Sequence, residues 1–485
     1  MNSIPTPQAN PRNGYAEDSD AIELQRMSRE GLREQPEMVE PASNNNLTGM
    51  NELSQENQRQ AVYTVLASCV LTFTGCGLNF AFGVYQELYE SMDGPFAGAS
   101  AAEIDLIGTL AVSLMTIGAP FASAWTKAYS PRRVTLVGAF GFSLANLLAS
   151  FGQELWHFVL AQGFLLGCAS CLSYIPAVTI APGWFDRRRG LAMGIILGCT
   201  GVGGVVWAPV LHKLNAWIGF RNTLRATAVL SFFLMAAAGY VLKWDPVSER
   251  QNQIGREASS GSAMVRVPLV NWQVARSRKF VAQALGTIFQ AAAYYTPLYF
   301  LSSYSRTLGY SAAAGANLIA ISNASNAGGK VVLGYIADRF GRLNTLLACT
   351  MISAVAALAL WLPSTSSGGI LMGRALFTAF TVLYSIFAGA YVSLFPTVLA
   401  ELFGTQNFTS VNGFLYMLRG LGILVGTPTA GALIRAGSSS DSSFTSSRGY
   451  EKSSTMVGIL LVFATIAVLW GRLEAVGLKE WKWRV

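Results

Sequence analysis

Residues 61–86 of the chain read AVYTVLASCVLTFTGCGLNFAFGVYQ, an apolar run without a charged side chain. A transmembrane helix needs about 20 apolar residues, because each residue adds about 1.5 Å and the hydrocarbon layer is about 30 Å thick. Similar runs recur with short breaks, and we predict transmembrane helices at 61–86, 106–127, 133–152, 155–180, 190–213, 223–243, 281–304, 313–337, 344–362, 368–396, 408–434 and 455–471. The sequence therefore predicts an all-α membrane protein with twelve transmembrane helices.

The composition agrees with a surface that faces lipid. Charged residues make up 12% of the 485 residues and the apolar set AVILMFWYC makes up 52%, whereas soluble proteins carry charge on about a quarter of their residues. The net charge of +8 does not indicate nucleic-acid binding, because Lys and Arg form short clusters between the apolar runs. The six cysteines, including the CASC motif at 168–171, fall in or beside apolar runs, so we expect packing residues rather than a redox or metal site.

The breaks between the runs predict the topology. Arginines cluster in the breaks after the second, fourth and eighth runs, and the sixth run is followed by a long basic linker. The breaks after the first and third runs contain no Lys or Arg. The positive-inside rule then places both termini and the linker in the cytoplasm. The breaks after the fifth and tenth runs do not follow the rule.

These observations divide the chain into five parts. We expect a disordered cytoplasmic tail at 1–58, a six-helix half at 59–243, a cytoplasmic linker at 244–280, a second six-helix half at 281–471, and a cytoplasmic tail at 472–485. A polar tail that lacks an apolar core is not a signal peptide. The whole is predicted to be a multi-pass protein, most simply of the plasma membrane.

An internal repeat supports the division into six and six spans. Pro176, Gly194 and Pro209 are spaced by 18 and 15 residues, and Pro396, Gly413 and Pro428 are spaced by 17 and 15. Two halves related in this way place the substrate between them near the bilayer midplane, and rocking of the halves gives alternating access.

Several motifs resemble those of a known family. The segment GYIADRFGR (334–342) is similar to the signature Gly-x-x-x-Asp-Arg-x-Gly-Arg of the major facilitator superfamily, whereas the first-half copy AYSPRR (128–133) has lost its Asp and Gly. Within the superfamily the chain most resembles the monocarboxylate porter-like family in its fungal branch, through NFAFGVYQ (79–86), WFDRRRGLAMG (184–194), GFR (219–221) and GTPTAG (426–431).

The resemblance also shows departures. Members that move lactate-like anions with a proton are known for a Lys late in the first span and an Asp–Arg pair in the eighth. The positions that correspond to them here are Val84 for the Lys, Asn326 for the Asp and Lys330 for the Arg. One positive charge is therefore kept in altered form, which puts simple proton–lactate symport in doubt.

Two charged residues lie at membrane depth. Lys330 is eight residues before Asp338, about 12 Å from the end of its span, and Arg419 is about ten residues into the eleventh span. An ionisable residue at that depth is expensive, at about 2.5–3.5 kcal/mol on insertion scales, so it is a functional candidate by default. Two cations in one cavity favour a carboxylate, although either one is also able to reach the interface or bond to a helix carbonyl.

Further polar residues accompany these cations. Asn323, Asn326 and Lys330 share one face of the eighth span because they are spaced i, i+3, i+7. The substrate-binding residues that we predict are Lys330, Arg419, Asn326, Asn323, Gln290, Asn79 and Tyr416. No Asp or Glu lies in the middle of a predicted span, so a buried proton relay is not evident, and proton coupling, facilitated diffusion and exchange all stay open.

Charges at the ends of the spans suggest gating. Asp338, Arg339 and Arg342, with Asp186 and Arg189, are expected to form contacts that hold one facing conformation and break in the other.

The leading hypothesis is a carrier for a small organic solute, with a monocarboxylate-like anion as the expected cargo and a single chain as the working unit. An efflux transporter for a fungal secondary metabolite is the alternative. A non-transporting receptor on the same fold is less favoured, because only residues 472–485 follow the last span. No nucleophile–base set, metal cluster or phosphate-binding loop was found, so we expect neither an enzyme nor a cofactor.

Overall fold

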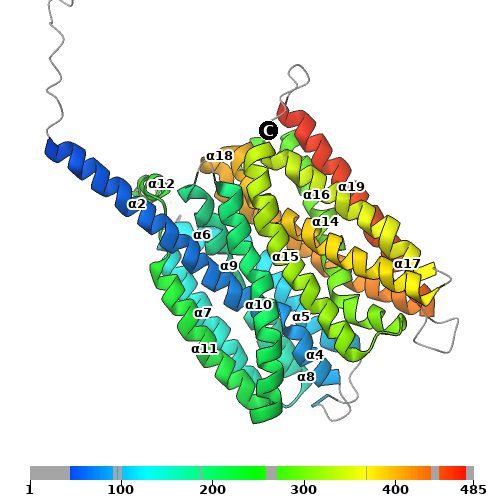
Figure 1. Cartoon of the computed structure of the whole chain (residues 1–485). Helices are drawn as coiled ribbons and strands as arrows, with labels where there is room; N and C mark the ends of the chain where they lie inside the picture. The colour runs from blue at the N-terminus through cyan, green and yellow to red at the C-terminus, as the bar shows by residue number, and fades with distance from the viewer. Residues whose placement is uncertain are drawn as a thin grey trace, which may run out of the picture. The chain divides into compact units, whose positions relative to one another are not determined.

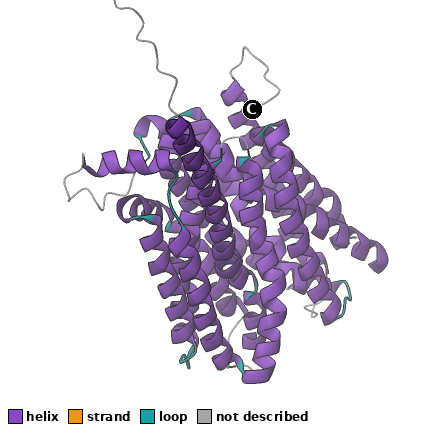
Figure 2. Ribbon diagram, turned by 60° about the vertical axis from the view of Figure 1, so that its left-hand side comes forward, coloured by secondary structure: helices purple, strands orange, loops and turns teal. Residues whose placement is uncertain are grey.

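The structure is a computed structural model, and it describes residues 44–90, 95–96, 101–185, 188–257, 270–366, 369–438 and 447–476. The described residues form helices joined by short loops (Figure 2). The chain divides into two units, Met1–Arg59 and Gln60–Val485, and the predicted domain boundaries stay predictions. Most of the tail predicted at 1–58 lies outside the described residues.

The first six predicted spans fall on helices of the larger unit. They correspond in order to α2 (Asn44–Leu71) with a π-helical turn (Thr72–Cys76), α3 (Gly77–Phe80) and α4 (Phe82–Glu90); α5 (Ala101–Ile117) with α6 (Ala119–Tyr129); α7 (Pro131–Ala149); α8 (Leu155–Phe158) with a π-helical segment (Val159–Leu165), α9 (Leu166–Ile180) and a 3-10 turn (Ala181–Trp184); α10 (Arg189–Ile218); and α11 (Phe220–Val241). The linker contains α12 (Pro246–Glu257) and α13 (Trp272–Ala275).

The last six predicted spans also fall on helices. They correspond to α14 (Arg278–Thr307); α15 (Ala312–Phe340); α16 (Arg342–Ala356) with a π-helical segment (Ala357–Trp361) and α17 (Leu362–Ser366); the two arms of α18 (Ile370–Ser438); and α19 (Glu451–Val476), which follows a 3-10 turn (Ser447–Tyr450). The arms of α18 meet at Gly404, whose φ of 71° is open to glycine but strained for other residues. We call them the first arm (Ile370–Gly404) and the second arm (Gln406–Ile434).

Among the described residues, eight helices are long and apolar enough to cross a membrane, and a ninth is added if the bent pair Leu106–Ile117 and Ala119–Tyr129 counts as one span. The other three predicted spans are α7, α14 and α15. All three carry polar side chains: α14 buries Gln283 and Gln290, and α15 buries Asn326 and Lys330. These polar groups lower the hydropathy of the helices, and their burial shows that they point into the protein.

Helices far apart in the sequence lie side by side. α7 lies against α11, α14 against α19, and α10 against α15 (Figure 1). The last pair joins the first six spans to the last six. Large apolar side chains are exposed on α7, α11 and α19, including Phe140, Phe233 and Ile466. Exposed apolar side chains on helices whose backbone groups are bonded internally are what a lipid environment requires.

Candidate functional site

Lys330 lies on α15 where this helix contacts α10. Its side chain is buried, with 2% of the residue exposed. The Nζ atom donates hydrogen bonds to the carbonyl oxygen of Leu197 at 3.0 Å and to Oγ1 of Thr200 at 2.8 Å. Both acceptors are on α10, so the bonds of this cation cross from the last six spans to the first six.

Arg419 lies on the second arm of α18 and is equally buried, with 2% exposed. Neither Nη1 nor Nη2 has a hydrogen-bond partner among the described residues. The guanidinium carbon lies 5.9 Å from the centre of the Tyr294 ring, and the charge also interacts electrostatically with that of Lys330. Buried charges are normally paired and hydrogen-bonded. The two donors of Arg419 are therefore available for an anion, and a carboxylate fits a guanidinium with two parallel bonds.

Tyrosine rings from three helices lie near Arg419. Tyr294 and Tyr295 on α14 pack edge to face, with ring centres 4.9 Å apart. Tyr174 on α9 and Tyr416 on the second arm have ring centres 6.0 Å apart. All four tyrosines are near enough to Arg419 to influence its charge. Tyrosine rings stabilise a buried cation, since the face of an aromatic ring attracts positive charge and the hydroxyl is able to form a hydrogen bond.

Two of the predicted amides belong to these surroundings. Asn326 donates a hydrogen bond from Nδ2 to the hydroxyl of Tyr294 at 3.1 Å. Gln290 is one helical turn before Tyr294 on α14, and it is buried with neither amide atom bonded to a described residue. The structure thus brings together Lys330, Arg419, Asn326 and Tyr416, and it buries Gln290 one turn from Tyr294.

Asn323 and Asn79 have other neighbours in the first six spans. Asn323 is half-buried against α10, where its side-chain amide lies opposite Gly204. Asn79 lines a small cavity among the first six spans, with Tyr85, Asn146 and Gln162. The described lining of that cavity contains none of the residues that surround the cations.

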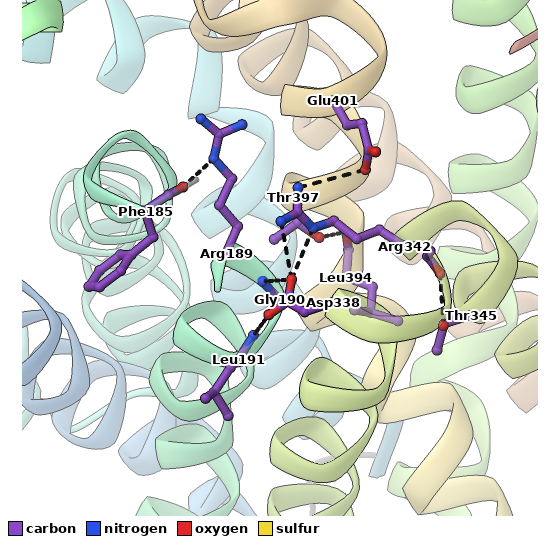
Figure 3. Close-up of polar contacts among 11 residues, drawn as sticks. Phe185, Arg189, Gly190, Leu191, Asp338, Arg342, Thr345, Leu394, Thr397 and Glu401 are labelled. Atoms are coloured by element: carbon purple, nitrogen blue, oxygen red, sulfur yellow. Dashed lines mark hydrogen bonds and ion pairs between the residues drawn. The ribbon is translucent and has the colours of Figure 1, made fainter. Parts of the chain in front are cut away.

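A second polar cluster lies at the end of α15, where Asp338 faces the start of α10 (Figure 3). The backbone N–H groups of Gly190 and Leu191 donate to the two carboxylate oxygens of Asp338, each at 2.9 Å. Arg342 is 3.1 Å from Asp338 and 3.7 Å from Glu401. A carboxylate at a helix N-terminus satisfies unbonded N–H groups and the helix dipole together. We call these residues the Asp338 cluster.

The other predicted gating residues lie differently. Arg189 donates from Nε to the carbonyl oxygen of Phe185 (Figure 3). Arg339 is exposed and stacks on Tyr335 of its own helix, with its guanidinium carbon 4.6 Å from the ring centre. Asp186 lies outside the described residues.

The sequence did not identify Thr200 or Glu401. Thr200 is one of many hydroxyl residues in apolar runs, and only the contact between α10 and α15 singles it out. Glu401 follows the tenth predicted span, so its pairing with Arg342 was foreseeable from the complementary charges at the ends of neighbouring spans.

Membrane-spanning helices that bury charged side chains at membrane depth are typical of a membrane carrier. The Major Facilitator Superfamily model matches residues 64–427, and the chain belongs to this family. The predicted superfamily is thereby confirmed, whereas the monocarboxylate porter-like subfamily stays a prediction.

Relatives and a solved structure agree with this assignment. The chain is 26% identical over 404 residues to the MFS-type transporter pynF of Aspergillus niger, covering 82% of this chain and 88% of pynF. It is 25% identical over 457 residues to the Agnestins efflux protein AgnL12 of Paecilomyces divaricatus, covering 94% and 97%. The proton:xylose symporter XylE superposes with a TM-score of 0.60 at 13% identity, covering 84% of this chain and 95% of XylE. The chain is a major facilitator transporter of small molecules, and the likeness to XylE shows the fold alone.

Proposed function

We propose that the chain transports a small organic anion and releases it on the side of the membrane opposite the Asp338 cluster. The observation that carries the proposal is the buried guanidinium of Arg419, whose two Nη atoms have no hydrogen-bond partner among the described residues. A second cation, Lys330, interacts with it electrostatically. Two like charges buried together are unfavourable unless a bound anion offsets them, and a carboxylate is the simplest anion that matches the fork of an arginine.

The relatives support outward transport of a metabolite. AgnL12 is named an efflux protein, and its alignment spans almost the whole of this chain. We therefore favour an acidic metabolite as cargo. A monocarboxylate importer that uses a buried carboxylate for its proton is less favoured, since Asn326 bonds to Tyr294 where the resembling family has an Asp.

The Asp338 cluster supports alternating access. It holds the start of α10 against the end of α15. We place this end of the two helices in the cytoplasm, because arginines cluster in the loops there and the positive-inside rule puts such loops on the cytoplasmic side. With the cluster intact the cytoplasmic end is closed, and opening that end requires the two N–H groups to leave Asp338. We propose a plasma-membrane protein that works as a single chain with cytoplasmic termini.

The test is a transport screen with the purified full chain in proteoliposomes. Radiolabelled acetate, lactate, benzoate and salicylate are each compared with the matching neutral amide, with and without a pH gradient. The proposal expects at least one acid to be moved in clear preference to its amide. Transport of amides at the same rate as acids, or of neither by an otherwise folded protein, contradicts it. Dependence on the gradient separates proton-linked transport from exchange.

A further inference from the structure

We infer that Lys330 is a switch that holds the empty carrier closed at the Asp338 end, and that Thr200 is the residue that positions it. The inference rests on the proposed function in one respect: an anion is what draws Lys330 away from Thr200. Reorientation of the carrier would then require a bound anion, so the protein would exchange anions across the membrane more readily than it moves them in one direction.

The first step is the place of the contact. α15 belongs to the last six spans and α10 to the first six, so any opening between α10 and α15 breaks the bonds from Nζ of Lys330 to Leu197 and Thr200. The backbones touch at this level, because a Cβ on Gly194 would overlap the carbonyl oxygen of Lys330. The contact therefore lies within the stretch, from Gly190 to Gly201, along which α10 packs closely on α15.

The second step is the orientation of the Thr200 hydroxyl. It donates its hydrogen to the carbonyl oxygen of Leu197 at 2.7 Å in its own helix. A hydroxyl has one hydrogen and two lone pairs, so the oxygen presents a lone pair to the Lys330 ammonium 2.8 Å away. Thr200 thus accepts from the cation in a fixed direction, and valine at this position would keep the shape without the acceptor.

The third step is the difference between the two cations. Lys330 has protein acceptors, whereas the Nη atoms of Arg419 have none among the described residues. An entering anion therefore meets Arg419 as an unsatisfied donor. A carboxylate carries a full negative charge, which attracts an ammonium more strongly than the partial charge of a hydroxyl or carbonyl oxygen does, so the anion also competes with Thr200 and Leu197 for Lys330. Once Lys330 turns to the anion, nothing bonds it to α10.

The experiment measures the opening without any ligand. Spin labels are attached at cysteines placed at Lys243, just after α11, and at Phe340, the last residue of α15, both of which are exposed. The six native cysteines of the full chain are replaced. Pulsed electron–electron double resonance then gives the distribution of distances between the two spin labels. Loss of a hydrogen bond to a charged group shifts an equilibrium by about tenfold or more. We therefore expect Thr200→Val to raise the ratio of long to short distances about tenfold.

The controls separate this contact from a general effect. Thr200→Ser keeps the acceptor and should match the parent. Thr350→Val removes a buried hydroxyl whose bonds to described residues stay within α16, and it should also match the parent. Lys330→Met should shift the distances as Thr200→Val does, and the double variant should shift them no further. If Thr200→Val matches Thr350→Val, or if the double variant shows the sum of the two single shifts, the inference is overturned. If the transport screen finds no preferred acid, the proposed function is wrong. The distances measured without ligand then still show whether Thr200 holds α10 against α15.

Discussion

Replacing Asp338 by Asn should weaken the contact with the start of α10, and the size of the effect on the opening of this end follows from the geometry. The carboxylate accepts two backbone bonds of 2.9 Å and lies 3.1 Å from Arg342. The side chains of Asp338 and Arg342 are only 9% and 11% exposed, so water screens these interactions little. Asparagine keeps one acceptor oxygen but turns an NH₂ group toward the other backbone N–H. The loss of one charge-assisted bond with an unsatisfied donor amounts to about 2–3 kcal/mol, or about a 30- to 150-fold shift toward opening at this end.

Thiol labelling measures this shift. Thr397 is buried and lies beside Arg342 (Figure 3), so a cysteine at that position reports opening at the Asp338 cluster. In a background without the native cysteines, Asp338→Asn should raise the rate of labelling by an impermeant maleimide at least tenfold. Arg339→Gln is the matched control, because Arg339 is exposed and stacks on its own helix. Equal labelling rates in the parent and Asp338→Asn would refute the assigned role of this cluster.

Three further changes test the site and its packing. Lys330→Ala should lower kcat/KM for the transported acid at least tenfold without lowering surface expression, and normal transport would remove Lys330 from the site. Tyr294→Phe removes the acceptor of Asn326 but keeps the ring beside Arg419, so KM should rise a few-fold with little change in thermal stability; an unchanged KM would place this bond outside substrate binding. Gly194→Val forces a side chain into the α15 backbone and should cost about 1–3 kcal/mol, seen as a lower Tm in detergent, whereas an unaltered Tm would contradict the close approach.

Most of the fold was predictable because every segment that crosses the lipid must form a helix of apolar residues. Apolar runs in the sequence located the helices, since backbone groups in hydrocarbon must bond within their own helix, although α7, α14 and α15 are less apolar than the other spans. The sequence could not show the bend of 48° between Leu106–Ile117 and Ala119–Tyr129, nor the π-helical turn at Thr72–Cys76. Both depend on how neighbouring helices pack, and the residue pattern of a single span does not predict this packing.

The sequence predicted the two cations of the site and several of its uncharged polar residues, but not the groups that bond to Lys330. Lys330 and Arg419 were found because charge is rare and costly at membrane depth. Their partners were not, because a neutral hydroxyl such as Thr200 or a backbone carbonyl such as that of Leu197 gives no signal in one sequence. Asn79 shows the converse: a polar residue in an apolar run was predicted for the site but lines a separate cavity.

The most direct test of anion transport compares Arg419→Gln with the parent chain in proteoliposomes. The measured quantity is the rate ratio between the acid that the parent moves fastest and its own amide. Arg472→Gln serves as the control, since Arg472 is buried but already bonded to Asn344. We predict that the parent and Arg472→Gln prefer the acid, and that Arg419→Gln loses at least tenfold of this preference. An undiminished preference in Arg419→Gln would contradict the assignment of Arg419 as the residue that binds the anion.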